Sequence, residues 1–232
     1  MSIKLYDLAT ADPALRFSPY CWRVKMALAH KGLEWEEIPI LFTEKHKLPH
    51  GSAGTVPVLE DGDAVVNDSW RIAEYLDQQY PDKPLFGCDE SRAHALLIKF
   101  WIERVVHPFI TRMGVGDFLS TLDEKDKPYF IESREKRLGM PIVEYMRNRE
   151  QSREGFRSSL EPLRAMLGEQ SFVAGNSPGF ADYIVFGILQ WMRCGSPFPS
   201  LERDDPVYRY RERLLDLFDG FGRNAKFREI MD

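Results

Sequence analysis

Residues 55–67 read TVPVLEDGDAVVN, two apolar runs joined by the polar segment EDGD. An Asp-Gly pair between apolar runs is typical of a tight β-turn, because glycine readily adopts the positive φ that such turns require. We therefore predict an antiparallel hairpin with strands at 56–59 and 64–66. Pro57 lies at the start of the first strand, a position where its missing N–H is tolerated.

The residues before this hairpin predict a strand, a helix and a second strand. Residues 3–8 alternate apolar and polar side chains, which is typical of a half-buried strand, and residues 37–41 form a second short strand pattern. Between them, Ser18 and Pro19 are typical of a helix start, and Gly32 is typical of its end. The connection is long enough for the two strands to be parallel.

A further helix follows the hairpin. Asp68 and Ser69 are capping residues, and apolar side chains then recur at helical spacing up to Pro81. The predicted order is β-α-β-β-β-α in the first 80 or so residues. This order, with a proline opening the third strand, resembles the thioredoxin-like arrangement.

The rest of the chain predicts helices alone. Amphipathic stretches occur at 94–118, 128–149, 155–167, 182–192 and 206–218. We therefore expect an α/β domain at 1–80, a proline- and glycine-containing linker at 81–88, and an all-helical domain at 89–232.

Composition excludes several classes of function. The chain has 232 residues, 44% of them hydrophobic, and its net charge is −5, so we expect no nucleic-acid partner. The longest uncharged apolar stretch, 183–192, is much shorter than the roughly 20 residues of a membrane span. We also expect no secretory signal, hence a cytoplasmic protein, and no metal site, because the three cysteines include no close pair.

The tetrapeptide Ser18-Pro19-Tyr20-Cys21 is the most specific local pattern for chemistry. A helix N-terminus stabilises a thiolate through its free N–H groups and positive partial charge. Since serine occupies the first position, the thiol would come from a small cofactor, and the Ser18 hydroxyl would donate a hydrogen bond to it. Alternatively, Ser18 and Pro19 only cap the helix, and Cys21 is either an inert core residue or a redox thiol.

Other residues could bind the remainder of such a cofactor. Val56 could offer its backbone N–H and C=O to an extended peptide, and Pro57 could orient that backbone. Asp68 and Ser69, at a helix N-terminus, could hold an ammonium and a carboxylate. The alternatives are a strand-start proline and a double N-cap.

These residues together resemble the cytosolic glutathione transferases. Within that superfamily, the segments IAEYLD at 72–77, FADY at 180–183 and SREKRLG at 133–139 are similar to the lignin β-aryl etherase and fungal etherase-like branch. Many members carry a Ser or Thr cap three residues before the aspartate that corresponds to Asp182, whereas Gly179 stands here, so we expect a weakened cap.

The resemblance implies roles for particular residues. Val56 would pair with the cysteinyl backbone of glutathione, and Asp68 and Ser69 would hold its γ-glutamyl end. Either Lys47 or His50 would bind the glycyl carboxylate. The pocket for an aromatic electrophile would be lined by Tyr20, Trp101, His107, Arg112 and Met113, and the protein would be a homodimer.

The implied activity is a glutathione transferase in which Ser18 activates the thiol, with β-aryl ether cleavage of lignin-derived compounds as the leading reaction. General conjugation or peroxidase activity toward small electrophiles is an alternative. Two further alternatives are a non-catalytic binding protein for apolar aromatics and thiol–disulfide exchange through Cys21.

Overall fold

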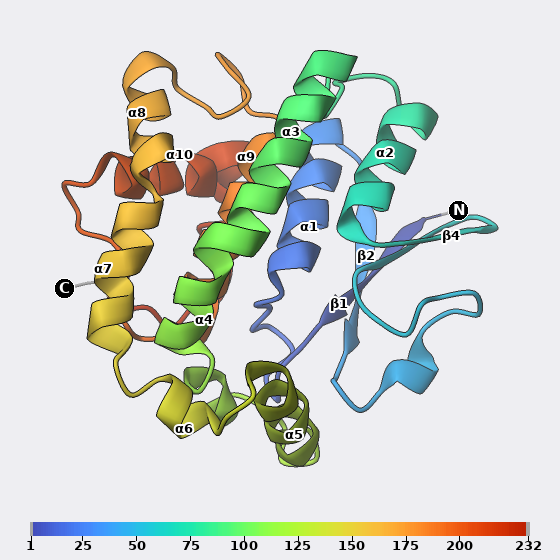
Figure 1. Cartoon of the computed structure of the whole chain (residues 1–232). Helices are drawn as coiled ribbons and strands as arrows, with labels where there is room; N and C mark the ends of the chain where they lie inside the picture. The colour runs from blue at the N-terminus through green and yellow to red at the C-terminus, as the bar shows by residue number, and fades with distance from the viewer. Residues whose placement is uncertain (1, 231–232) are drawn as a thin grey trace.

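The computed structural model describes residues 2–230, and its N-terminal part contains a four-stranded mixed sheet of order β2-β1-β3-β4. The strands are β1 (Ile3–Leu8), β2 (Trp35–Ile40), β3 (Val58–Asp61) and β4 (Ala64–Asn67). β1 is parallel to β2 and antiparallel to β3. The helices α1 (Pro19–Lys31) and α2 (Ser69–Gln79) pack side by side (Figure 1). This topology confirms the predicted thioredoxin-like arrangement.

Several strand boundaries differ from the prediction by one or two residues. The second strand begins at Trp35 and ends at Ile40, and the third begins at Val58, after a cis Val56-Pro57 bond. Pro57 has no N–H to donate to a ladder, so regular pairing starts one residue later.

The alternation in β1 separates two apolar clusters on the two faces of the sheet. Leu5 is fully buried in the main core, which also contains side chains of α1, α2 and the C-terminal helices. Tyr6 instead contacts a small cluster with Ile40 and Val58. One core therefore joins the sheet's helical face to the rest of the chain.

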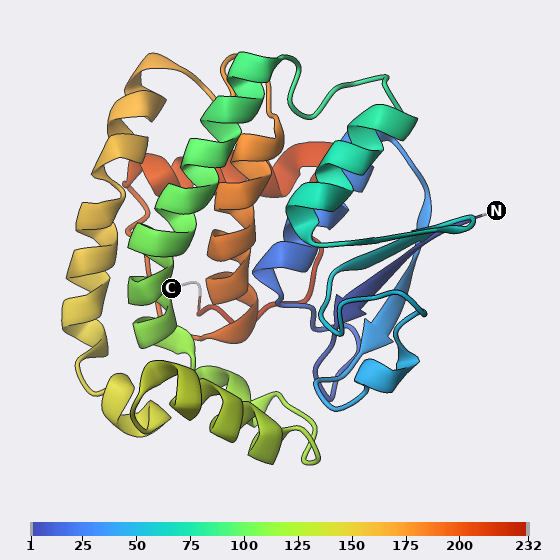
Figure 2. The ribbon, with the colours of Figure 1, turned by 45° about the vertical axis from the view of Figure 1, so that its right-hand side comes forward.

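The C-terminal part is helical, as predicted, and consists of α3 (Asp89–Trp101), a π-helical turn (Ile102–Val106), α4 (His107–Gly114), α5 (Lys127–Leu138), α6 (Ile142–Tyr145), α7 (Arg149–Ser159), α8 (Glu161–Glu169), α9 (Phe180–Gly195) and α10 (Pro206–Gly220). Short 3₁₀ turns occur at Lys45–Lys47 and Asp117–Ser120. α5 and α6 run across one end of this helical part (Figure 2).

Three predicted helices are interrupted. The stretch 94–118 contains the π-helical turn between α3 and α4. The stretch 128–149 is divided at Gly139, which has a φ of 73°, and at Pro141. The stretch 155–167 is divided near Pro162, because proline has no backbone N–H to continue the helical hydrogen bonding.

The buried helix α9 joins the two parts by packing against α1. Gly187 lies at the closest approach, where a Cβ would collide with the carbonyl oxygen of Pro19. Glycine therefore lets α9 approach the first turn of α1, next to Ser18. Among residues 2–230, no helix combines the length and the apolar character needed to cross a membrane.

Candidate functional site

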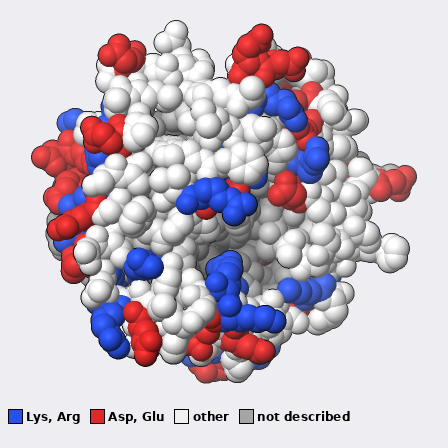
Figure 3. Space-filling model, in the orientation of Figure 1, with Lys and Arg blue, Asp and Glu red and all other residues white. Residues whose placement is uncertain are grey.

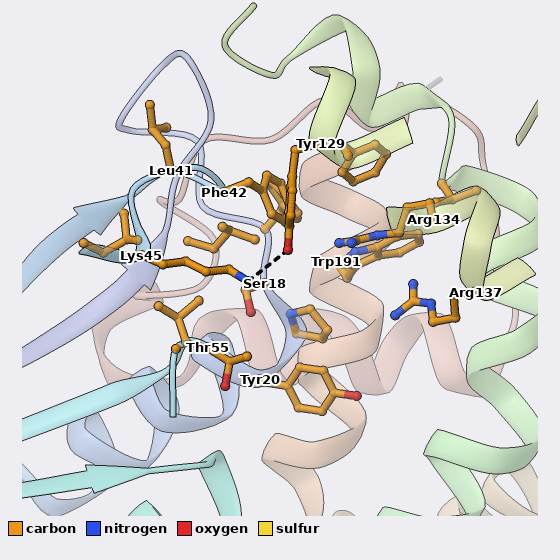
Figure 4. A pocket seen from close by; sticks show the side chains of 18 of the residues that line it. Ser18, Tyr20, Leu41, Phe42, Lys45, Thr55, Tyr129, Arg134, Arg137 and Trp191 are labelled. Carbon is orange, nitrogen blue, oxygen red and sulfur yellow. Dashed lines mark hydrogen bonds between the residues drawn. The ribbon is translucent and has the colours of Figure 1, made fainter. Parts of the chain in front are cut away.

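A cavity of about 250 Å³ lies between the two parts of the molecule (Figure 4). Its walls come from the start of α1 and the loop before it, the long loop between β2 and β3, and the helices α4, α5 and α9. The aromatic side chains on it are Phe17, Tyr20, Phe42, Tyr129, Phe130 and Trp191. The cavity can therefore accept a ligand with an aromatic body.

Ser18 lies on the wall of this cavity and is the N-cap of α1. Its Oγ accepts a hydrogen bond from the N–H of Cys21 at 3.3 Å, and Pro19 occupies the first turn. That bond uses an oxygen lone pair and leaves the hydroxyl proton free. Among residues 2–230 no group accepts a hydrogen bond from this hydroxyl, so it can donate one to a ligand in the cavity.

Cys21 is one turn into α1 and has no exposed surface. Burial, and next the charge of Asp7, hold the pKa of its thiol well above the ordinary value. The thiol is therefore protonated at neutral pH, and the geometry favours its interpretation as a core residue over a redox role.

The Val56-Pro57 segment places backbone groups at the cavity. Val56 is partly buried on the cavity wall, and Pro57 is buried behind it. Within residues 2–230, no backbone hydrogen bond outside the regular strands uses the N–H or C=O of Val56. Both groups are thus available to an extended peptide.

Asp68 and Ser69 lie together at the start of α2 but outside the cavity lining. The Asp68 side chain accepts hydrogen bonds from the N–H groups of Trp70 (3.0 Å) and Arg71 (3.2 Å), so the N-cap interpretation holds for this residue. Ser69 is 1% exposed, and its Oγ has no hydrogen-bond partner among the described residues. An unpaired buried hydroxyl is unusual and is consistent with a binding role.

The cation that reaches the cavity from the loop after β2 is Lys45, not Lys47 or His50. Lys47 pairs with Glu44 at 2.7 Å in the same turn, and His50 is exposed outside the lining. Lys45 lines the cavity and donates to the hydroxyl of Tyr129 at 2.9 Å. The sequence pattern showed several cations in this loop, but only the 3₁₀ turn decides which one faces inward.

Two of the five side chains predicted for the electrophile pocket, Tyr20 and His107, line the cavity. Met113 is fully buried in the core. Arg112 is exposed, with its guanidinium 4.7 Å from the ring centroid of Tyr145. Trp101, at the end of α3, is partly buried and lies outside the lining.

The spacing of residues along α4 explains this correction. The face of α4 toward the cavity carries His107 and Thr111, followed by Val115 just beyond the helix, at a spacing of four residues. Arg112 and Met113 follow His107 on the same helix but not at this spacing, so they lie on other sides of α4. The π-helical turn separates Trp101, at the end of α3, from this face.

His107 is electrically neutral in this cavity at neutral pH. Burial, followed by the positive charges of Arg23 and Arg137, lowers its pKa to about 4. Burial also raises the pKa of the Tyr20 hydroxyl. His107 can therefore act as a neutral hydrogen-bonding group but not as a cation.

Arg134 and Arg137 line the cavity from α5 and were not predicted as site residues. They point toward its interior from the side opposite Lys45 (Figure 4). Their spacing of three residues on a helix with Phe130 one turn earlier was the available signal. It could not be used because the sequence does not show which face of α5 meets the sheet domain.

Two family models match the chain, one to each part. The model described as the glutathione S-transferase N-terminal domain matches residues 13–84. The model described as the glutathione S-transferase C-terminal domain matches residues 93–205.

Curated relatives share part of the sequence. The chain is 44% identical over 72 residues to glutathione S-transferase Z1 of Arabidopsis thaliana, across 29% of this chain and 33% of that protein. It is 31% identical over 140 residues to the glutathione S-transferase-like protein ustS of Aspergillus flavus, across 53% of this chain and 49% of that protein. The chain thus spans between about a third and a half of the length of these relatives.

Solved structures share the fold over the whole chain. A glutathione S-transferase of Ceriporiopsis subvermispora, solved in complex with glutathione, has a TM-score of 0.77 and 20% identity, covering 95% of this chain and 98% of that one. Glutathione transferase GSTFuA3 of Phanerochaete chrysosporium has a TM-score of 0.78 and 22% identity, covering 100% and 99%. With family models matched to both the sheet-containing and the helical parts, the chain belongs to the glutathione S-transferase superfamily.

Proposed function

We propose that the protein is a glutathione transferase in which Ser18 activates the thiol of glutathione for attack on an aromatic electrophile. The observation that carries this proposal is the free hydroxyl of Ser18 at the N-terminus of α1, on the wall of an aromatic cavity. Membership of the superfamily supports glutathione as the cosubstrate.

Ser18 would act by stabilising the thiolate. A thiol with a pKa of about 8.5 is only about 3% ionised at pH 7, and lowering that pKa by about two units requires ~2.7 kcal/mol. A hydrogen bond from the Ser18 hydroxyl and the partial charge of the helix N-terminus are together of that size. No separate base is needed once the thiolate is formed and placed near the electrophile.

The rest of glutathione would bind along the sheet domain. The free backbone groups of Val56 would pair with the cysteinyl residue, while Asp68 and the unpaired hydroxyl of Ser69 would hold the γ-glutamyl end. For the glycyl carboxylate, Lys45 is a better candidate than Lys47 or His50, because it lines the cavity while Lys47 is paired with Glu44.

Two substitutions test the role of Ser18. Ser18→Ala should lower kcat/KM toward an aromatic electrophile roughly 10- to 100-fold at pH 7, because the bound thiol loses its stabilisation. It should also raise the pKa of enzyme-bound glutathione, followed by the ultraviolet absorbance of the thiolate. Cys21→Ala is the control and should leave both values nearly unchanged. The opposite pattern would favour thiol–disulfide exchange through Cys21.

The finer proposal is glutathione-dependent cleavage of a β-aryl ether. The thiolate sulfur would form a bond to the carbon next to a ketone, while the bond from that carbon to the aryloxide breaks. The aryloxide leaves with the electron pair and takes a proton from water. Mass analysis with an α-keto β-aryl ether dimer should show free phenol and the glutathionyl ketone only when glutathione is present. If neither product forms although glutathione binds, general conjugation, peroxidase activity or storage of aromatics is the better proposal.

We also propose that the protein is a cytoplasmic homodimer. Support for the dimer comes from apolar side chains exposed on and just after α3, with Leu97 67%, Phe100 47% and Val105 46% exposed. Light scattering should give twice the chain mass of 26.9 kDa. A monomer at micromolar concentration would contradict this proposal.

A further inference from the structure

The charged side chains on the cavity are all cations. Lys45, Arg134 and Arg137 line it, and no Asp or Glu among the described residues 2–230 does so. On the face shown in Figure 3, Lys and Arg side chains stand above and below the central hollow. This local excess of positive charge contrasts with the net charge of −5 for the whole chain.

Arg134 is the most informative of the three. Its guanidinium lies 4.6 Å from the ring centroid of Phe130 and 5.2 Å from that of Phe42. Its one hydrogen bond is donated to the neighbouring Ser133 Oγ at 3.0 Å, and no carboxylate in residues 2–230 pairs with it. Burial, and then the charge of Arg137, lower its pKa to about 10. Its positive charge is therefore held in an unfavourable environment without a counter-ion.

An anionic ligand would compensate this charge. Two guanidinium groups one turn apart on a helix can each donate to a carboxylate, and such charge-assisted hydrogen bonds are among the stronger ones in proteins. The aromatic walls formed by Phe42, Phe130 and Trp191 would contact the apolar body of the same ligand.

We propose, on the basis of the proposed function, that the electrophilic substrate carries both an aryl group and a carboxylate, and that Arg134 and Arg137 bind this carboxylate. The two arginines lie across the cavity from Lys45 and the loop that carries it (Figure 4), and they belong to α5, not to the sheet domain. Their position separates the carboxylate of the second substrate from the site proposed for glutathione. They thus determine substrate specificity without taking part in thiol activation.

Two other roles for the arginines make different predictions. Arg134 could contribute only packing against Phe42 and Phe130, in which case acidic and neutral substrates are equivalent. Alternatively, either arginine could bind a carboxylate of glutathione. In that case its removal weakens glutathione binding, whichever electrophile is used.

A matched pair of substrates distinguishes these roles. We would compare 4-(bromomethyl)benzoate with 4-(bromomethyl)benzamide, which has the same reactive carbon and a neutral group in place of the carboxylate. The wild-type protein should prefer the acid in kcat/KM by roughly 10-fold or more, the size expected for a charge-assisted hydrogen bond. Arg134→Gln and Arg137→Gln should each remove most of this preference and leave KM for glutathione unchanged.

The chain offers close controls. Arg134→Lys keeps the charge and should retain part of the preference for the acid. Lys136→Gln removes an exposed cation between the two arginines on the same helix, outside the cavity, and should retain all of it. Circular dichroism and thermal unfolding would verify that each variant is folded.

The results distinguish failure of the carboxylate site from failure of the proposed transferase function. Equal losses for acid and amide, or a higher KM for glutathione in the arginine variants, would overturn the carboxylate site while leaving transferase activity intact. If neither compound is turned over, the proposed function fails, and calorimetry with 4-methylbenzoate and 4-methylbenzamide then tests the site by itself. Preference for the benzoate that is lost in Arg134→Gln would support the site, and equal binding of both compounds would overturn it.

Discussion

At the scale of single residues, His107 shows how the cavity controls protonation. Its side chain is partly buried beside Trp191, and its pKa is lowered from 6.5 to about 4 by burial and by two nearby arginines. Between these two values the unfolded chain binds a proton at this residue that the folded chain excludes. His107 therefore makes the folded state less stable as the pH falls from about 6.5 toward 4.

This linkage predicts a measurable pH dependence. Each pH unit below 6.5 should cost the wild-type protein up to ~1.4 kcal/mol of unfolding free energy through His107 alone. The free energy of unfolding in urea should differ less between pH 5 and pH 7.5 in His107→Gln than in the wild type. The exposed His50→Gln is the control and should retain the wild-type difference. If the free energy of unfolding changed with pH as much in His107→Gln as in the wild type, His107 would not be the source of the pH dependence.

At the scale of an element, the start of α9 is organised by Asp182. Its buried carboxylate accepts hydrogen bonds from the N–H groups of Val173 (2.7 Å), Ala174 (3.1 Å) and Gly179 (3.0 Å), and from the Tyr210 hydroxyl (2.6 Å). Gly179 has no side chain to complete the cap, as expected. Crowding explains why glycine occupies this position, because a Cβ there would lie 2.9 Å from the Ala174 Cβ and 3.1 Å from the Leu85 carbonyl oxygen.

Two substitutions at this helix start should therefore both be destabilising. Asp182→Ala leaves several buried donors unpaired and should lower the free energy of unfolding by about 3 kcal/mol or more. Gly179→Ser would restore the usual capping residue, yet overpacking should make it destabilising by about 1 kcal/mol or more. Chemical denaturation would measure both, with the exposed Asp216→Ala as control. Stabilisation by Gly179→Ser would show that the crowded neighbours move easily.

At the scale of the whole molecule, buried polar contacts fix the two parts relative to each other. Asp126, which precedes α5 and has no exposed surface, accepts hydrogen bonds from the N–H groups of Phe42 (2.9 Å) and Thr43 (3.0 Å) and from the Thr43 hydroxyl (2.7 Å). On another side of the interface, Arg23 pairs with Glu103 at 2.8 Å. Asp126 thus holds the loop that carries Lys45 against the helix that carries Arg134.

Removing this connection should loosen the cavity. We expect Asp126→Ala to increase hydrogen exchange in residues 41–54 because their backbone loses its acceptor, while exchange in the buried helix α9 changes little. Hydrogen-exchange mass spectrometry would measure both segments. Asp123→Ala is a close control, since within residues 2–230 the Asp123 carboxylate accepts only a local bond from the Lys125 N–H at 3.1 Å. Unchanged exchange in 41–54 would mean that other contacts hold the loop.

The sequence alone determined the order of strands and helices in the first 80 or so residues and the place of Ser18 at a helix start. The Asp-Gly turn, the Ser18-Pro19 helix start and the Gly32 helix end all act within a few residues, so their effects can be predicted locally. The tertiary structure decided which side chains line the cavity. Lys45 lines the cavity where Lys47 was predicted to bind, and Arg134 and Arg137 line it without having been predicted. Arg112 and Met113, which were predicted, lie outside its lining. These outcomes depend on the rotation of α4 and α5 and on contacts between residues 84 positions apart, such as Phe42 and Asp126, which local patterns do not encode.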